Sequence, residues 1–330
     1  MPLLLAIPDP PDMSHAAPGE VPDLPALSEL MRQGQASLPD RDWRSGLLRD
    51  VGLGHLASLA PAEIAAHALS LEPGSSVCLA SPVHVVAGMS RVHLHAEGVL
   101  RLSAGQRSGF HAAFVAQFGH DPLLHPVGEG FVLEAPWAHV ADDGDPCGWR
   151  GAPLSRSPAG TPELQSMRRT GAEIEMWLAA SAWNEARERS GALTANLLWL
   201  WGGGRVPIRT AARLALPLHL HAGHVDPWLG GLAALVGQSV QSPPDAWNES
   251  GIDADAPGHT QVILLPAAGN DMRHWQDMES RWFEPLLRDL RARRQGSLTL
   301  RLGRRSWLVR LRMWRSLLRK SRPWWQVAGA

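Results

Sequence analysis

The chain has 330 residues and a mass of 35.8 kDa, with 45% hydrophobic and 19% charged residues, which is a globular composition and excludes a disordered chain. The formal net charge of -1 excludes a general attraction to nucleic acid or to anionic membranes. Two cysteines, Cys78 and Cys147, are too few for a disulfide scaffold or a cysteine-rich zinc module. The longest apolar runs are much shorter than the roughly 18 residues of a membrane span, and Leu3–Ile7 is too short for the core of a signal peptide. We therefore expect a cytoplasmic protein.

Helices and strands are expected to alternate in the first half of the chain. In chain order they are a buried strand at 3–7, helices between 24 and 66, two strands within 77–99, a helix capped by Ser103 and a strand at 131–133. The two strands within 77–99 are expected to be joined by a turn at Gly88–Ser90. Residues 138–162 are rich in Pro, Gly and Asp, and we interpret them as a linker between lobes at 1–150 and 151–330 that act as one functional unit.

The second half continues the same alternation. The expected elements are an amphipathic helix ended by Gly191, an apolar strand at 196–201, a half-exposed strand at 214–220, a buried strand at 262–265, a helix from about 275 to 294, and a hairpin of strands at 298–302 and 307–311. The alternation favours an α/β fold over an all-α or an all-β fold.

The sequence Trp-Leu-Trp-Gly-Gly-Gly-Arg at 199–205 is the most specific motif. Three glycines after a buried strand allow the backbone to approach a ligand closely, and their N–H groups can form a cradle for an anion. Arg205 adds a guanidinium that can bind phosphate or carboxylate through two parallel hydrogen bonds. The motif lacks the Lys-Ser/Thr of a phosphate-binding loop and the spacing of a dinucleotide-binding fingerprint. The alternative is a tight strand exit whose tryptophans belong to the core.

A second candidate site is the group His219, His221, His224 and Asp226. Histidines on one side of a strand, followed by further ligands after a turn, can bind zinc or iron. The group resembles the histidine signature of metallo-β-lactamase-type hydrolases, but Gly223 stands where those enzymes have an aspartate. The alternative is that these histidines lie on the exposed face of an edge strand.

From Arg281 to Ala330 the chain has thirteen arginines and one lysine, but only two acidic residues, Glu284 and Asp289. The interleaved tryptophans are Trp307, Trp314, Trp324 and Trp325. Arginine with aromatic residues can bind single-stranded nucleic acid or a membrane surface. The alternative, which we favour, is a hairpin and helix whose arginine stems cover apolar surface, so nucleic acid is not expected as the partner.

The run Asn184-Glu-Ala-Arg187, followed by Asn196 and the Trp-x-Trp-Gly motif, resembles a bacterial family of RpfE-type regulatory proteins. The resemblance covers nearly the whole chain, and further similar stretches are Ser81–His84, Asp226–Ala233 and Trp282–Leu287. Ser81 departs from the aspartate that the family usually has there. That family is in turn similar to the archaeal-type cofactor-independent phosphoglycerate mutases of the alkaline-phosphatase superfamily, which carry a similar Asn-x-x-Trp-x-Trp-Gly-x-Gly stretch.

This resemblance implies a layered α/β sandwich with a reduced alkaline-phosphatase-like core. The mutases need two metal ions and a serine that carries the phosphoryl group. Here the first strand ends in Pro-Asp-Pro at 8–10 where the mutases have Asp-Gly, and their Asp-His-Gly segment has no counterpart. Asn270 stands four residues before His274, where a ligand aspartate would be expected. The pattern indicates a pseudoenzyme that has lost the metal ligands and kept the glycine turn.

Our first hypothesis is therefore a non-catalytic regulatory protein without a cofactor, which binds a small phosphorylated or carboxylated ligand or a partner protein. The expected ligand-binding residues are Asn184, Arg187, Asn196, Trp199, Trp201, Gly202, Gly203, Gly204 and Arg205. The alternative is a metal-dependent enzyme similar to phosphoglycerate mutases or phosphatases. Its zinc or manganese ligands would come from His219, His221, His224, Asp226 and His274.

Overall fold

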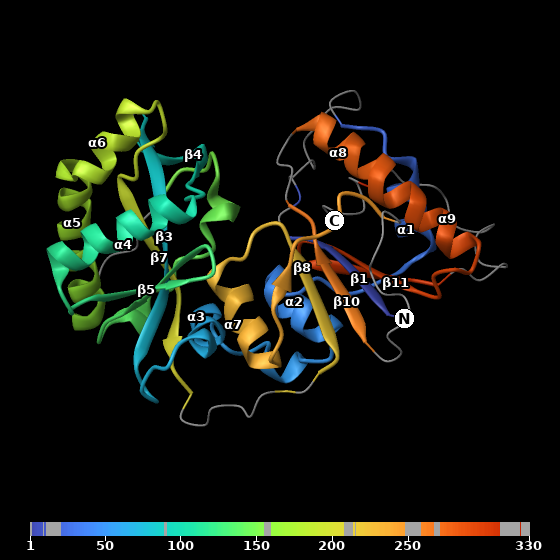
Figure 1. Cartoon of the computed structure of the whole chain (residues 1–330), viewed down its shortest axis with the longest axis horizontal. Coiled ribbons are helices and arrows are strands. Elements are labelled where there is room, and N and C mark those ends of the chain that lie inside the picture. Colours follow the sequence, from blue (N-terminus) through green and yellow to red (C-terminus); the bar gives the residue numbers. More distant parts are fainter. Residues whose placement is uncertain are drawn as a thin grey trace. The chain divides into compact units, whose positions relative to one another are not determined.

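The computed structural model of the chain describes residues 2–8, 10, 21–88, 91–154, 160–207, 214, 216–247, 259–266, 271–310 and 324. The chain forms two units, each built on its own β-sheet (Figure 1). The first unit consists of residues 1–58, 215–223 and 238–330, and the second of residues 59–214 and 224–237. The lobe boundary expected at residue 150, and the linker expected at 138–162, both lie within the second unit. The chain divides by sheet, because the strands of the first sheet come from segments far apart in the sequence.

The sheet of the first unit has seven strands among the described residues. In spatial order they are β2 (Gln35–Ala36), β12 (Arg305–Val309), β11 (Leu298–Leu302), β1 (Leu3–Ile7), β10 (Thr260–Leu264), β8 (Leu218–Ala222) and β9 (Val240–Gln241). The strands from β11 to β9 are parallel, while β12 and β2 are antiparallel to their neighbours. Leu-rich strands suit this arrangement, because parallel strands are covered on both faces. The expected buried strands at 3–7 and 262–265 are confirmed, with β10 one to two residues earlier.

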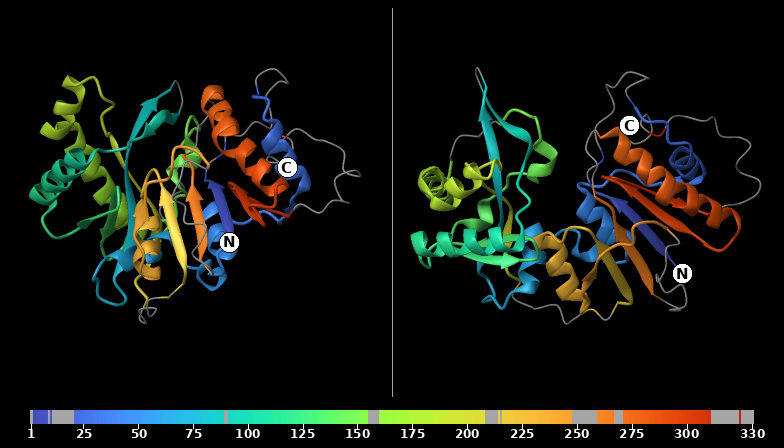
Figure 2. Two further views of the ribbon diagram at one scale, coloured as in Figure 1. Left: turned by 45° about the vertical axis from the view of Figure 1, so that its right-hand side comes forward. Right: turned by 45° about the horizontal axis from the view of Figure 1, so that its top comes forward.

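Helices cover both faces of this sheet (Figure 2). One face packs against α1 (Pro25–Gln33), α8 (Met272–Met278) and α9 (Glu284–Arg291), which are joined to a core that includes Leu3, Leu5, Trp275 and Phe283. The opposite face is covered by α2 (Trp43–Asp50), which is followed by a short 3-10 helix, η1 (Gly54–Leu56). Alternate residues of each strand thus enter different layers, as the two-residue period of a strand requires.

Two expectations for the C-terminal part of this unit are confirmed with changed details. The helix expected at 275–294 is formed by α8, a π-helical turn, η5 (Glu279–Phe283), and α9 in one continuous run. The hairpin is formed by β11 and β12, and its turn is shorter than expected, because Leu302 already pairs with Arg305. Gly303, at φ +52°, provides the left-handed backbone that this two-residue turn requires.

The second unit has a five-stranded antiparallel sheet in the part that the structure describes. Its strands are β3 (Ser76–Ala87), β4 (Val92–Val99), β5 (Leu123–Val127), β6 (Gly130–Glu134) and β7 (Leu197–Arg205). The long strand β3 is central and pairs with β4, β6 and β7. The strands expected within 77–99 and at 131–133 are confirmed, whereas β5 was not expected.

Two layers of helices enclose this second sheet. One core layer contains residues of α4 (Ala104–Phe118) and α5 (Pro162–Ala180), next to α6 (Ala182–Arg189). The other layer contains α3 (Pro61–Ala65), which packs against α7 (Pro227–Val236). The remaining 3-10 helices are η2 (Ala66–Ala68), η3 (Ala138–Val140) and η4 (Pro146–Trp149).

Helix caps follow the sequence closely in this unit, with one break that was not expected. Ser103 caps α4, since its Oγ accepts a hydrogen bond from Gln106 N at 3.3 Å. The amphipathic helix is divided at Ser181, whose extended backbone ends α5 and whose Oγ caps α6. Gly191 follows α6 at φ +73°, as expected of a glycine at a helix C-terminus.

The expected fold class is confirmed as a mixed α/β fold with two sheets, layered helices and a C-terminal hairpin. Among the described helices, the longest has 19 residues, and none combines the length and apolarity needed to cross a membrane.

Candidate functional site

The three glycines of the Trp-Gly motif lie inside a strand. Strand β7 continues to Arg205, and Gly204 pairs with Val77 of β3. Gly203 N donates to Ala141 O at 2.8 Å. The strand exit expected after Trp201 is therefore wrong by four residues, because the glycine backbone continues the pairing with β3.

Close packing on the segment explains why it carries no side chains. A Cβ on Gly203 would collide with the carbonyl oxygen of Ala138, and one on Gly204 would lie 2.5 Å from Glu63 Cγ. Gly202 adopts φ +61°, and a Cβ there would meet the ring of Pro61 at 3.0 Å. Glycine in a strand often marks such an approach of other backbone. The approaching groups here are α3 and η3 rather than a ligand.

An internal carboxylate occupies the place where the motif predicted an external anion. Glu63, on the first turn of α3, accepts a hydrogen bond from Arg205 N through Oε1 at 3.1 Å. Its Oε2 accepts one from Ala60 N at 2.8 Å. The backbone N–H groups of Gly203 and Arg205 thus both have protein partners, whereas the side chain of Arg205 is exposed and can meet a ligand.

Arg205 presents an exposed guanidinium at the end of β7. Its Nη2 lies 3.2 Å from His139 Nε2. Because a guanidinium can only donate, His139 accepts through Nε2, and the proton of the neutral ring lies on Nδ1. That Nδ1 is buried and has no hydrogen-bond partner among the described residues. The end of β7 therefore combines an oriented cation with an unsatisfied buried donor.

Asn184 and Asn196 have structural roles at the entry to β7. Asn184 is 7% exposed, donates to Leu178 O at 2.7 Å and Ala195 O at 2.6 Å, and accepts from Ala195 N at 2.9 Å. Asn196 accepts from Val85 N at 2.7 Å and donates to Val85 O at 2.8 Å. Asn184 thus connects the end of α5 to the segment before β7, and Asn196 connects that segment to β3.

The other predicted ligand residues are also packed within the second unit. Arg187 donates from Nε to Leu193 O at 2.7 Å, and burial lowers the pKa of its guanidinium. Trp199 donates to Gly144 O at 2.9 Å, and Trp201 donates to Ser81 Oγ at 3.1 Å. Both indoles are at least nine-tenths buried. Their polar atoms connect strands and loops.

The histidine candidates are distributed over the two units. His219 and His221 lie on β8 and His274 on α8 in the first unit, whereas His224 and Asp226 belong to the second. The part of the chain that the structure describes contains no group of three or more His, Cys, Asp or Glu side chains that could hold a metal ion. Asp9 and Asn270, which the comparison with mutases singled out, lie outside that part.

Protein partners account for most of these candidates. His224 Nδ1 lies 2.5 Å from Glu129 Oε2, and Asp226 caps α7 by accepting from Leu229 N at 2.8 Å. His221 Nε2 lies 2.9 Å from Gln261 Oε1. The interpretation of an exposed edge strand is wrong for His221, since β8 lies between β10 and β9 and this side chain is 6% exposed.

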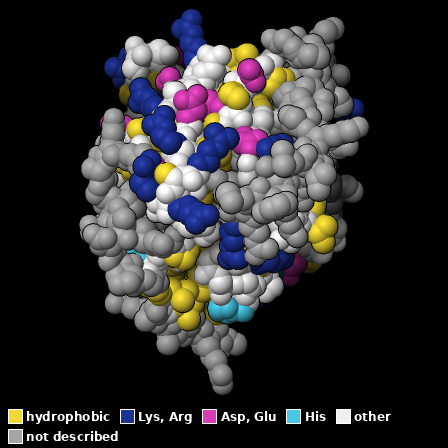
Figure 3. Space-filling view, turned by 90° about the vertical axis from the view of Figure 1, so that its right-hand side faces the viewer, with side chains coloured by type: hydrophobic (Ala, Val, Ile, Leu, Met, Phe, Trp, Pro, Cys, Tyr) yellow, Lys and Arg dark blue, Asp and Glu magenta, His cyan; other side chains and the backbone are white. Residues whose placement is uncertain are grey.

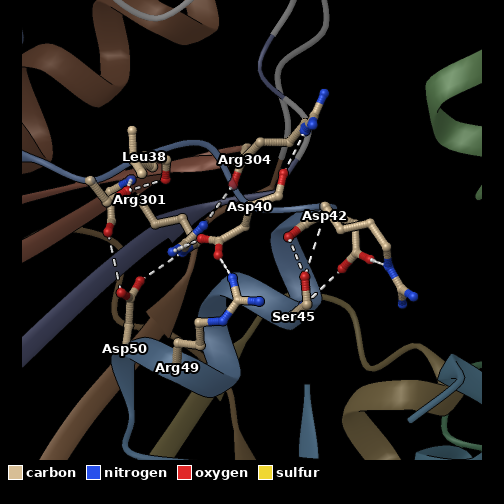
Figure 4. Close-up of polar contacts among 12 residues, drawn as sticks. Leu38, Asp40, Asp42, Ser45, Arg49, Asp50, Arg301 and Arg304 are labelled. Carbon is tan, nitrogen blue, oxygen red and sulfur yellow. Dashed lines mark hydrogen bonds and ion pairs between the residues drawn. The ribbon is translucent and has the colours of Figure 1, made fainter. Parts of the chain in front are cut away.

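A buried ionic network in the first unit was not expected from the sequence (Figure 4). Arg301 of β11 is 1% exposed and donates to Asp40 Oδ2 at 2.9 Å and to Asp50 Oδ2 at 2.7 Å. Asp40 also pairs with Arg49, and its carbonyl accepts from Arg304 Nε at 2.7 Å. The sequence signal is an arginine at 301 between buried leucines. With its hydrogen bonds satisfied inside the fold, the network has a structural role.

The tryptophans of the arginine-rich C-terminal segment do not form a stacking surface where they are described. Trp307 is 1% and Trp324 2% exposed, and both belong to the core of the first unit. Trp314 and Trp325 lie outside the described residues. Basic side chains are numerous on the face shown in Figure 3. Within the arginine-rich segment, Arg294 is paired with Asp289. Single-strand recognition by stacking has no support from these residues.

Comparisons with known proteins give a distant structural similarity. No protein-family model matches the chain, and no curated protein matches it. Among solved structures, the chain is similar to a cofactor-independent phosphoglycerate mutase from Thermoplasma acidophilum, with 17% identity, a TM-score of 0.43, and coverage of 99% of this chain and 97% of the mutase. It is also similar to the PH0037 protein from Pyrococcus horikoshii, with 13% identity, a TM-score of 0.48, and coverage of 99% and 92%. The resemblance to RpfE-type regulatory proteins is not confirmed by these comparisons.

Proposed function

We propose that the chain is a non-catalytic regulatory protein that binds a small phosphorylated or carboxylated ligand through Arg205. The exposed Arg205 guanidinium, oriented by His139, is the observation that carries this proposal. The other polar side chains of the predicted site, those of Asn184, Arg187 and Asn196, are engaged with backbone groups.

The chemistry of this end of β7 suits an anion that is bound by a side chain. A guanidinium binds phosphate or carboxylate through two parallel hydrogen bonds, and this geometry selects the ligand as well as attracting it. Glu63 already accepts the backbone N–H of Arg205, so the guanidinium is the group of this residue that can bind the ligand. The carboxylate of Glu63 repels an anion close to the strand backbone. The anionic group of the ligand is therefore expected to contact the outer end of the Arg205 side chain.

The test is a calorimetric titration of chelator-treated protein with 3-phosphoglycerate, which carries both a phosphate and a carboxylate. We expect Arg205→Ala to weaken binding by at least about tenfold, since a charge-assisted pair is lost, and Arg205→Lys to restore part of it. Arg189→Ala is the matched control, because Arg189 is an exposed arginine of the same unit. Equal affinity of the wild type and Arg205→Ala would refute the proposed site.

A second measurement separates binding from catalysis. Phosphorus NMR follows 3-phosphoglycerate in the presence of the protein with added Mn²⁺ or Zn²⁺. We expect neither conversion to 2-phosphoglycerate nor release of phosphate. Conversion that a chelator abolishes would replace this proposal with the alternative of a metal-dependent mutase or phosphatase.

A further inference from the structure

Two histidines meet at the amino-terminal ends of the parallel strands β8 and β10. His219 is the second residue of β8, and His259 directly precedes β10, whose Thr260 pairs with Leu218. The ring centroids lie 4.7 Å apart, and the ring planes are inclined to each other by 29°. His219 Nε2 lies 2.5 Å from His259 Nδ1. Hydrogen bonding between the two strands therefore brings two ring nitrogens face to face.

Facing imidazole nitrogens can share either a proton or a metal ion. Two neutral rings share the proton of one N–H···N hydrogen bond, and a metal ion can take its place when the donor ring carries its proton on the other nitrogen. Neutral imidazole is a preferred ligand of Zn²⁺, Ni²⁺ and Cu²⁺. The sheet positions both rings in advance, which reduces the entropy that two free side chains would lose on binding.

A third imidazole on the same strand and face also has an unused nitrogen. His221 is 6% exposed, and its Nε2 donates to the Gln261 amide oxygen at 2.9 Å. This hydrogen bond fixes the proton of the neutral ring on Nε2 and leaves a lone pair on Nδ1. That atom is buried and has no hydrogen-bond partner among the described residues. The same face of β8 thus carries a second imidazole nitrogen with a free lone pair, although this atom is buried.

We propose that His219 and His259 form a two-histidine site for a divalent transition-metal ion such as Zn²⁺, with water in the remaining coordination positions. A tetrahedral zinc ion with bonds of 2.0–2.1 Å would place the two nitrogens about 3.3 Å apart. The two nitrogens, which are now 2.5 Å apart, must therefore move apart by about 0.8 Å. Both are only partly buried, which leaves them room to turn. The site lies in the first unit and does not depend on Arg205 or on any enzymatic activity.

The first test is a calorimetric titration of chelator-treated full-length protein with ZnCl₂ at pH 7.5. We expect one bound ion per chain, and a loss of affinity of at least about tenfold in both His219→Ala and His259→Ala, since each removes one of two protein ligands. His120→Ala is the control, because it removes an exposed imidazole of the second unit. Failure of the wild type to bind, or wild-type affinity in both variants, would overturn the site.

A second measurement does not depend on the folding of any variant. Nitrogen-15 NMR of the histidine rings in the wild type reports which nitrogens bind the ion. Added Zn²⁺ should shift the resonances of His219 Nε2 and His259 Nδ1, and the shifts should disappear at acidic pH as protons displace the ion. Unchanged ring resonances at saturating Zn²⁺ would show that the contact is a proton-bridged pair and would overturn the proposal.

Discussion

At the scale of single residues, the glycines of β7 show how one sequence pattern can have two causes. A glycine run permits the approach of a phosphate or of another segment of backbone, and the residue types are the same in both cases. Here Pro61, Glu63 and Ala138 approach the run, and all three are distant from it in the sequence. The ligand cradle could not be distinguished from packing without the positions of these segments.

Gly203→Ala tests the packing explanation. The added methyl group collides with the Ala138 carbonyl oxygen, so we expect a loss of about 1–3 kcal/mol in the free energy of unfolding, as for other overpacked sites. Gly171→Ala, in the interior of α5 with open space around it, should stabilise the protein by about 0.5–1 kcal/mol. Urea denaturation measures both. A Gly203→Ala variant as stable as the wild type would contradict the packing role.

Arg301 is the second residue whose role depends on distant partners. Arg301→Leu leaves the buried Asp40 with only the exposed Arg49 as its cation and removes the cation of the half-buried Asp50, so we expect a loss of about 3–5 kcal/mol. Arg304→Ala, whose guanidinium is exposed, should cost about 1 kcal/mol or less. Chemical denaturation of the two variants gives the comparison. Equal losses would show that the buried network contributes little.

At the scale of elements, the sequence predicted correctly those features that depend on interactions between residues close in the chain. The Ser103 cap of α4, the glycine after α6, the hairpin of β11 and β12, and the buried strands depend on residues close in sequence, and their patterns were sufficient. Strand β5 was not predicted because Pro126 interrupts its alternation of apolar and polar residues. Its extended conformation is stabilised by pairing with β6. The length of β7 and the order of strands depend on non-local pairing, which sequence periodicity does not encode.

Helix α1 also depends on a residue that is far from it in the sequence. Its N-terminus has no side-chain cap of its own, and the Glu279 carboxylate of the π-helical turn accepts hydrogen bonds from Ala26 N and Leu27 N. Burial raises the pKa of this carboxyl above its ordinary value of 4.5, although the two backbone donors oppose the shift. The ionised carboxylate is therefore less favourable in the fold than in water, because burial removes part of its hydration.

This raised pKa gives a pH dependence with a definite sign. The folded state binds more protons than the unfolded state between pH 4.5 and the higher folded pKa, so the contribution of Glu279 to stability falls as pH rises through that window. The stability of the wild type relative to Glu279→Gln should therefore decrease from pH 4.5 upward and then become constant. Glu188→Gln, which changes an exposed carboxylate of α6 in the second unit, is the control. A difference that rises with pH would contradict the assignment.

At the scale of the whole molecule, the division by sheets predicts how fragments behave. Fragment 1–150 would contain β1 without its neighbours β10 and β11, and β3 without β7. Fragment 151–330 would contain the complementary strands without β1 and β3. We expect neither fragment to fold alone, and nitrogen–proton NMR spectra of each should show the narrow amide dispersion of an unfolded chain. A well-dispersed spectrum from either fragment would support the lobes expected from the sequence.

The position of β1 also bears on the order in which the protein can fold during synthesis. β1 is made long before its partners β10 and β11, which begin at residues 260 and 298, so its two edges stay unpaired until those strands have left the ribosome. All strands of the second sheet lie between residues 76 and 205 and can pair much earlier. A hydrophobic N-terminal strand that waits this long is exposed to aggregation and to chaperones. The nascent chain is therefore most vulnerable at β1.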